Sequence, residues 1–192
     1  MKKNIKEWLK QRLNKEKYLH VIGTEKAAVE LAKKFNVDEN KASIAALLHD
    51  CAKYLTPDEL YKIIKEKNIE VSEMEMECAK TLHAPVGAYF AGTYFDINDN
   101  EILDAIRYHT IGRINMTMLD KIIFLSDKIE LETRDMDFSI KARNVLDKTN
   151  NIDEAILICY NATIKSLLDR KMVINPSTID VYNYLTILLS KN

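Results

Sequence analysis

Apolar residues recur at intervals of three and four positions along most of the chain, which is the spacing of amphipathic helices. The first such stretch carries Ile5, Trp8, Leu9 and Leu13. No window shows the sustained two-residue alternation that is typical of strands. Four Gly and three Pro are few and favour long helices over many short strands. The pattern therefore predicts an all-α protein, a single domain of roughly eight to ten helices over residues 1–192.

Capping signals indicate where several of these helices begin. The clearest is Thr56-Pro57-Asp58-Glu59, in which Thr caps, Pro takes the first helical position and Glu completes a capping box. Asp38 can cap the helix that carries His49 and Asp50. The other helices are expected at about 5–13, 24–35 after a Thr24 cap, 57–67, within 68–80, 84–95, 99–109, 117–131, 138–148, 152–172, and 178–190 with Ser177 or Thr178 as cap.

Composition and charge exclude several classes of protein. A net charge of −1 gives no overall attraction to nucleic-acid polymers or membranes, so no partner of either kind is expected. Apolar runs are too short to span a bilayer. The three cysteines are far apart and form no C-x-x-C pair, which argues against a disulfide framework and fits a reducing compartment. We therefore expect a cytoplasmic protein.

The apolar stretch from Ala45 to Lys53 places a histidine and a carboxylate, His49 and Asp50, side by side. Burying either side chain without a partner would be costly. A single histidine on an apolar face is more often a hydrogen-bonded core residue than a ligand. The chain has only three other histidines, and each lies at an apolar boundary, while Asp127 lies inside an apolar helix. This repetition favours one shared site over separate core residues.

Imidazole and carboxylate groups without a thiolate suit a divalent metal of borderline hardness, namely Fe, Mn, Zn, Co or Ni. Adjacent residues on a helix point about 100° apart. His49 and Asp50 can therefore share a metal only at the helix edge, with further ligands from other helices. This requirement predicts a helical bundle wrapped around a metal site.

The ordered histidines and aspartates, each in its own sequence context, give the chain a family resemblance. It resembles the HD-domain metal-dependent phosphohydrolases and, more narrowly, the bacterial YqeK family of symmetrical diadenosine tetraphosphate hydrolases. The resemblance implies an HD core over about 18–132 followed by C-terminal helices over about 137–190. The segments that carry it are 18–24, 45–53, 83–88, 105–113, 120–130, Pro176 and 182–185.

The same resemblance implies a set of metal ligands. The site would hold one or two transition-metal ions, most often iron. The principal ion would be held by His20, His49, Asp50 and Asp127. His83 and His109 would either bind a second metal or contact the substrate phosphates, and the sequence does not decide between these roles. Asp50 is expected to face both positions, because a carboxylate has two oxygens that can each ligate.

Several other residues are candidates for substrate binding and catalysis. Lys53 lies three residues after Asp50, on the same side of the expected helix, and both are candidate catalytic residues. For Lys53 and the cationic candidates, an ordinary solvated surface role is nearly as well supported. The candidate substrate-binding residues are Lys53, Thr110, Arg113, Lys128 and Arg134.

The activity that the resemblance implies is symmetrical cleavage of diadenosine tetraphosphate into two ADP, through attack of a metal-activated water on phosphorus. A homodimer is common among members of the family. Two other functions stay open. One is an HD phosphohydrolase acting on mononucleotides or guanosine alarmones, because a metal centre recognises phosphates and not bases. The other is a nucleotide-binding module without catalysis, which the presence of all six candidate ligands disfavours.

Overall fold

The structure is a computed structural model that describes residues 1–191, and every regular element in that range is helical, as predicted. Within these residues it contains eleven α-helices, one more than the expected upper limit, and the short helix α5 lies in the acidic segment where a helix was expected. The elements are α1 (Lys2–Arg12), α2 (Lys15–Lys34), α3 (Glu39–Leu48), α4 (Pro57–Glu66), α5 (Glu73–Met76), the 3-10 helix η1 (Ala79–Thr81), α6 (His83–Tyr94), α7 (Asn100–Tyr108), α8 (Met118–Ile129), α9 (Met136–Thr149), α10 (Ile152–Asp169) and α11 (Pro176–Leu189).

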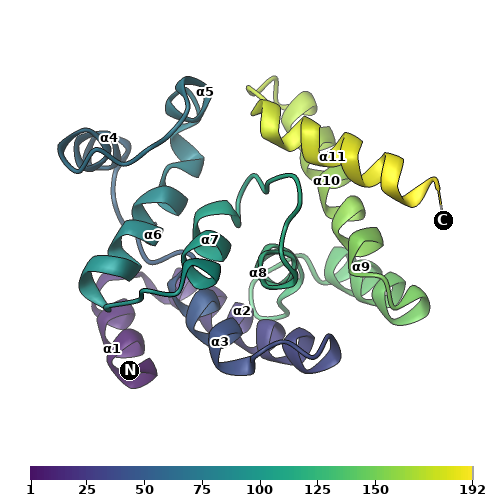
Figure 1. Cartoon of the computed structure of the whole chain (residues 1–192), viewed down its shortest axis with the longest axis horizontal. Coiled ribbons are helices and arrows are strands. Elements are labelled where there is room, and N and C mark those ends of the chain that lie inside the picture. Colours follow the sequence, from purple (N-terminus) through teal and green to yellow (C-terminus); the bar gives the residue numbers. More distant parts are fainter. Residues whose placement is uncertain (192) are drawn as a thin grey trace.

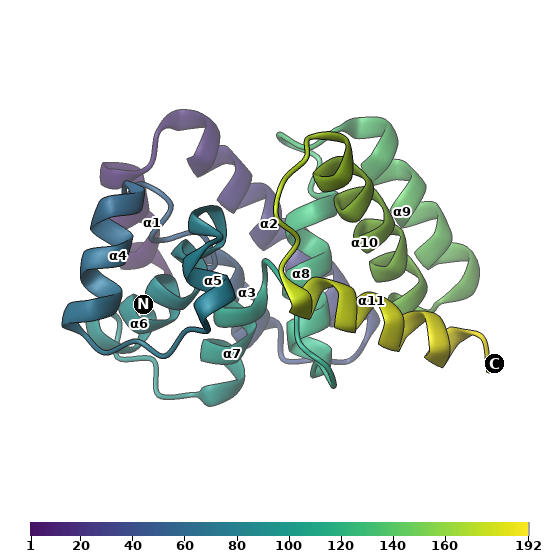
Figure 2. The same cartoon turned by 90° about the horizontal axis from the view of Figure 1, so that it is seen from above.

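The helices α2, α3, α7 and α8 form the centre of the molecule. Helix α2 packs against α3 and α8, and α7 packs against both α3 and α8. In both views, α1, α4, α5 and α6 lie on one side of this centre and α9, α10 and α11 lie on the other (Figures 1 and 2). The central helices bury mainly aliphatic side chains, and within residues 1–191 no helix is both long and apolar enough to cross a bilayer.

Most capping predictions are confirmed, but the start of α2 differs. Thr56, Asp38, Asp99 and Thr117 cap helices as expected. Helix α2 begins ten residues before the expected position, since Asn14 accepts from the Lys17 amide at 2.8 Å and caps it there. The Thr24 hydroxyl instead donates to the His20 carbonyl at 2.9 Å, inside the helix. His20 therefore lies on a continuous helix of 20 residues.

Two other boundaries also differ from the predictions. Helix α3 ends at Leu48, so Asp50 lies in a series of turns instead of on the helix. The reason is a change of backbone bonding, with the Cys51 amide bonded to the Leu48 carbonyl at 3.1 Å and the Lys53 amide to the Asp50 carbonyl at 3.0 Å. Helix α11 is capped by Asn175, not by Ser177 or Thr178, because Pro176 already takes the first helical position.

Candidate metal centre

Four imidazoles and two carboxylates from five segments of the chain converge in the centre of the molecule. His20 comes from α2 and Asp127 from α8, while His49, His83 and His109 lie at helix ends, where side chains can be aimed at a common point. All six residues are buried. The short distances are 2.9 Å from His20 Nε2 to Asp127 Oδ1, 3.4 Å from His20 Nε2 to His49 Nε2, 3.1 Å from His83 Nε2 to Asp50 Oδ1 and 3.3 Å from His83 Nε2 to His109 Nε2.

Asp50 lies between two groups of potential ligands. His20, His49 and Asp50 form one group, and Asp50, His83 and His109 form the other, each with donor atoms within 4.8 Å of one another. Asp50 Oδ2 lies 3.4 Å from His49 Nε2, whereas Oδ1 lies 3.6 Å from His109 Nε2. The two oxygens of one carboxylate thus face different groups, which is an arrangement that can bridge two cation positions.

The hydrogen bonds of the outer ring nitrogens, the Nδ1 atoms, determine the tautomer of each imidazole in the cluster. A carbonyl oxygen can only accept, so each Nδ1 bonded to a carbonyl must carry the proton. The acceptors are the carbonyls of Ala46 for His49 at 2.6 Å, Lys80 for His83 at 2.9 Å and Ile106 for His109 at 2.7 Å. Burial, reinforced by the neighbouring His49 and His83, lowers the pKa of His109 to about 4. A neutral ring protonated on Nδ1 presents the lone pair of Nε2 to the cluster.

A divalent cation fits this arrangement. Nε2 lone pairs 3.3–3.4 Å apart repel each other unless a positive charge lies between them. Asp50 Oδ1 is buried without a hydrogen-bond partner, and such an atom is costly unless something else compensates it. Burial opposes ionisation of Asp127, yet the positive charges of Lys128 and Arg134 hold the pKa of Asp127 well below its usual range. Neutral imidazoles with ionised carboxylates are a suitable ligand set for a transition metal.

Glu130 is a part of the centre to which the sequence assigned no role. It is fully buried, and its Oε1 lies 3.0 Å from His20 Nδ1, where it accepts the ring proton. The backbone amide of Glu132 donates to Oε2 at 2.6 Å. A Cβ added at Gly23 would lie 2.3 Å from Oε2, so the glycine leaves room for this carboxylate. Carboxylates in such positions fix the tautomer and orientation of a metal-binding histidine.

Substitution Glu130→Gln is therefore expected to weaken metal binding about 10- to 100-fold, because the amide no longer fixes His20 as a carboxylate does. The measurement is the dissociation constant for the metal, obtained by competition with a chelator. Glu132→Gln is the matched control, since Glu132 is an exposed carboxylate paired with Lys26. An equal metal affinity in both variants would show that Glu130 does not position His20.

Three of the predicted cationic residues border the cluster. Lys53 Nζ lies 2.7 Å from Asp50 Oδ2. Lys128 contacts Asp127. Arg134 Nη2 lies 2.5 Å from Asp127 Oδ1 and 3.3 Å from His20 Nε2. Lys53 and Arg134 remain about a third exposed at the side chain, so both can also reach a ligand.

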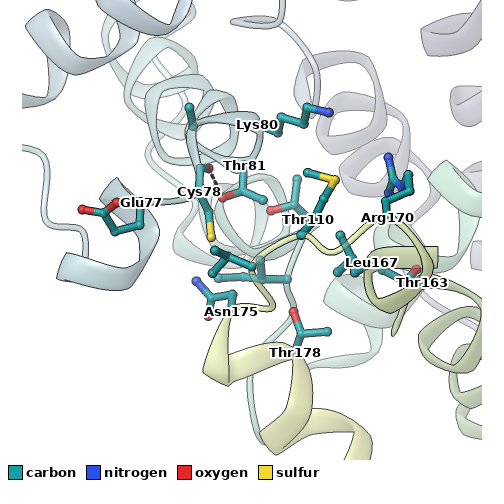
Figure 3. A pocket seen from close by; sticks show the side chains of 14 residues that line it. Glu77, Cys78, Lys80, Thr81, Thr110, Thr163, Leu167, Arg170, Asn175 and Thr178 are labelled. Atoms are coloured by element: carbon teal, nitrogen blue, oxygen red, sulfur yellow. Dashed lines mark hydrogen bonds between the residues drawn. The ribbon is translucent and has the colours of Figure 1, made fainter. Parts of the chain in front are cut away.

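The other two predicted substrate-binding residues lie elsewhere. Thr110 follows His109 directly and lines a cavity of about 410 Å³ (Figure 3). Arg113 is held by Asp104 at 2.9 Å and by Asp120 at 2.8 Å, and its guanidinium stacks over the ring of Tyr108. The structure thus gives Arg113 two carboxylate partners of its own instead of bringing it to the metal ligands, and its role in substrate binding stays a prediction.

The class of the protein follows from this fold and site. Residues 18–132 match the HD domain, and the chain belongs to the HD-domain family, whose members are metal-dependent phosphohydrolases. The expected resemblance is confirmed. The chain is 34% identical over 92% of its length to the symmetrical bis(5'-nucleosyl)-tetraphosphatase of Bacillus subtilis, covering 93% of that protein. It is 37% identical to the protein of the same name from Halalkalibacterium halodurans, over 92% of each chain.

A solved structure resembles the whole chain. It is the crystal structure of a predicted HD superfamily hydrolase involved in NAD metabolism from Clostridium acetobutylicum, which superposes with a TM-score of 0.90 at 33% identity. The match covers 99% of this chain and 97% of that one. The C-terminal helices α9 to α11 are therefore shared with that hydrolase as well as the HD domain.

Proposed function

We propose that the protein hydrolyses diadenosine tetraphosphate symmetrically into two ADP. The observation that carries the proposal is the buried cluster around Asp50, in which one carboxylate faces two groups of imidazoles and three cations lie at the border. The cluster suits a polyphosphate, and the proteins named symmetrical bis(5'-nucleosyl)-tetraphosphatase supply the choice of substrate.

Under this proposal, His20, His49, Asp50 and Asp127 hold the principal metal, and iron is the proposed ion, with Mn, Zn, Co or Ni as alternatives. His83 and His109, with Asp50, hold a second ion or the substrate phosphates. A bound ion supplies Lewis-acid polarisation of a phosphoryl oxygen and a water of lowered pKa. Lys53 and Arg134 neutralise the charge that develops on the phosphoryl oxygens. The fixed tautomers keep the four Nε2 lone pairs directed at the same centre.

The reaction balances with one water. The water oxygen forms a bond to one of the two central phosphorus atoms, and the bond between that phosphorus and the central bridging oxygen breaks. One ADP keeps the bridging oxygen, and the other ADP carries the oxygen from water on its terminal phosphate. The leaving group is an ADP phosphate, whose charge Lys53, Lys128 and Arg134 are placed to stabilise.

The test is hydrolysis of diadenosine tetraphosphate in oxygen-18-labelled water, with products separated and analysed by mass spectrometry. We expect ADP as the only nucleotide, half of it carrying one labelled oxygen, and activity that a chelator removes and an added metal restores. AMP together with ATP would contradict symmetrical cleavage. Faster turnover of mononucleotides or guanosine alarmones in the same assay would favour that alternative, and metal-loaded protein without any turnover would favour a binding module.

We further propose that the protein is cytoplasmic. Its three cysteines are free, as is usual for proteins of a reducing compartment. Cys51 and Cys159 are buried, so they serve as apolar core residues. The homodimer implied by the family resemblance stays a prediction.

A further inference from the structure

The turn that follows α3 leaves one main-chain carbonyl, that of Lys53, without a donor in its own segment. If the i to i+3 bonding of this turn continued, the next donor would be the amide of residue 56, and in a helix it would be that of residue 57. The Thr56 amide instead donates to Glu59 Oε2 at 2.7 Å, as part of the capping box that starts α4. Pro57 has no amide hydrogen. The sequence that begins α4 therefore leaves the Lys53 carbonyl to a donor from elsewhere.

Lys17 of α2 supplies that donor. Its Nζ donates to the Lys53 carbonyl at 2.9 Å, in a partly buried bond between positions 36 residues apart. The Lys17 ammonium forms no ion pair with a carboxylate within residues 1–191, so its charge is not used in a surface salt bridge. Lys17 lies three residues before His20, on the same side of α2. The bond thus ties the helix that carries His20 to the turn that carries Asp50 and Lys53.

This tie bears on the position of the Lys53 ammonium. Lys53 Nζ lies 2.7 Å from Asp50 Oδ2, and the Lys53 side chain is about a third exposed. A lysine side chain is long and flexible, so the place that its ammonium reaches depends on how firmly its backbone is held. The Lys53 backbone lies in a series of turns and not in a helix, and the bond from Lys17 is a long-range restraint on it. A misplacement of about 1 Å at a catalytic group can cost about a hundredfold in rate.

We propose that Lys17 is a positioning residue for the reaction, which holds the turn after α3 by the Lys53 carbonyl and thereby places the Lys53 ammonium against the substrate phosphates. The inference rests on the proposed function, in which Lys53 neutralises charge on the phosphoryl oxygens. Lys17 acts through Lys53 and not by contact with the substrate. Removal of the Lys17 donor should therefore matter only while the Lys53 ammonium is present.

The test is a double-mutant cycle on the metal-loaded protein, with kcat and KM measured for diadenosine tetraphosphate. Lys17→Met removes the donor and keeps an unbranched side chain, and Lys53→Met removes the ammonium that Lys17 places. We expect Lys17→Met to lower kcat about tenfold or more and Lys53→Met to lower it at least as much. In the Lys53→Met background, Lys17→Met should lower kcat by less than about twofold further.

Lys15→Met is the matched control, because Lys15 is an exposed lysine in the same first turn of α2. It should keep the kcat and KM of the unchanged protein. Lys17→Gln repeats the cycle with a shorter polar side chain, and circular dichroism checks that each variant is folded. An equal fold-loss from Lys17→Met in both backgrounds would overturn the inference. Unchanged kcat in either folded single variant, Lys17→Met or Lys53→Met, would also overturn it.

The outcome is separable from that of the proposed function, because the cycle can also be measured without turnover, as the calorimetric affinity of the metal-loaded protein for pyrophosphate. Each single variant should bind pyrophosphate about three- to tenfold more weakly, and the double variant no more weakly than Lys53→Met. A protein that shows this coupling but does not cleave diadenosine tetraphosphate keeps the positioning role and loses the proposed reaction. A protein that releases two ADP but shows independent losses at the two lysines keeps the reaction and loses the positioning role.

Discussion

Replacing Asp50 by alanine is expected to lower the hydrolysis of diadenosine tetraphosphate by about a thousandfold or more. Asp50 is the one residue whose two oxygens face both ligand groups, with Oδ1 3.1 Å from His83 Nε2 and Oδ2 3.4 Å from His49 Nε2. Its removal also leaves Lys53 without its carboxylate partner at 2.7 Å. The loss therefore affects metal binding, the neighbouring imidazoles and a candidate catalytic cation at once.

The measurement combines metal content per chain with kcat for the tetraphosphate. We expect Asp50→Ala to lose bound metal together with activity, and Asp50→Asn to fall in between on metal content, since it keeps one neutral oxygen ligand. Asp153→Ala is the control, because it removes a carboxylate from an ion pair with Lys121 at 2.8 Å, away from the cluster. Unchanged metal content and kcat in folded Asp50→Ala protein would refute the metal assignment.

The caps of α3, α4, α7 and α8 could be predicted because each depends on residues within one turn of the helix start. The start of α2 could not be predicted in this way. Thr24 has the local features of a cap, but Asn14 has them too, and its bond from the Lys17 amide starts the helix ten residues earlier. Local sequence alone does not choose between two candidate caps, because tertiary packing can override local preference.

The candidate ligands could be predicted as a set because burial makes unpaired histidines and aspartates conspicuous in an apolar pattern. The turn after Leu48 that lets Asp50 face two groups could not be predicted, because the apolar helical pattern continues to Ala52 and gives no sign of the change to i to i+3 bonding.

The loop after His109 contacts the C-terminal helices at Gly112, which packs against Tyr160 of α10. Gly112 has a positive φ of 75°, and a Cβ added there would lie 2.0 Å from the hydroxyl oxygen of Tyr160. That hydroxyl donates to the Ile111 carbonyl at 2.9 Å. Burial raises the pKa of Tyr160, so the hydroxyl keeps its proton and stays a donor. The glycine is thus required by backbone conformation and by space together.

Gly112→Ala is expected to lower the free energy of unfolding by about 2–6 kcal/mol, from backbone strain of about 1–3 kcal/mol and overpacking of about 1–3 kcal/mol. Tyr160→Phe should cost about 1–3 kcal/mol, because the Ile111 carbonyl loses its buried partner. The measurement is urea unfolding of both single variants and of the double variant.

The double variant distinguishes the two causes. Tyr160→Phe removes the oxygen at 2.0 Å and leaves the Tyr160 ring carbon at 3.4 Å as the nearest contact, which is close to ordinary packing. The combined loss should therefore be about 1 kcal/mol or more below the sum of the single losses. Strictly additive losses would mean that the steric contact with Tyr160 contributes nothing.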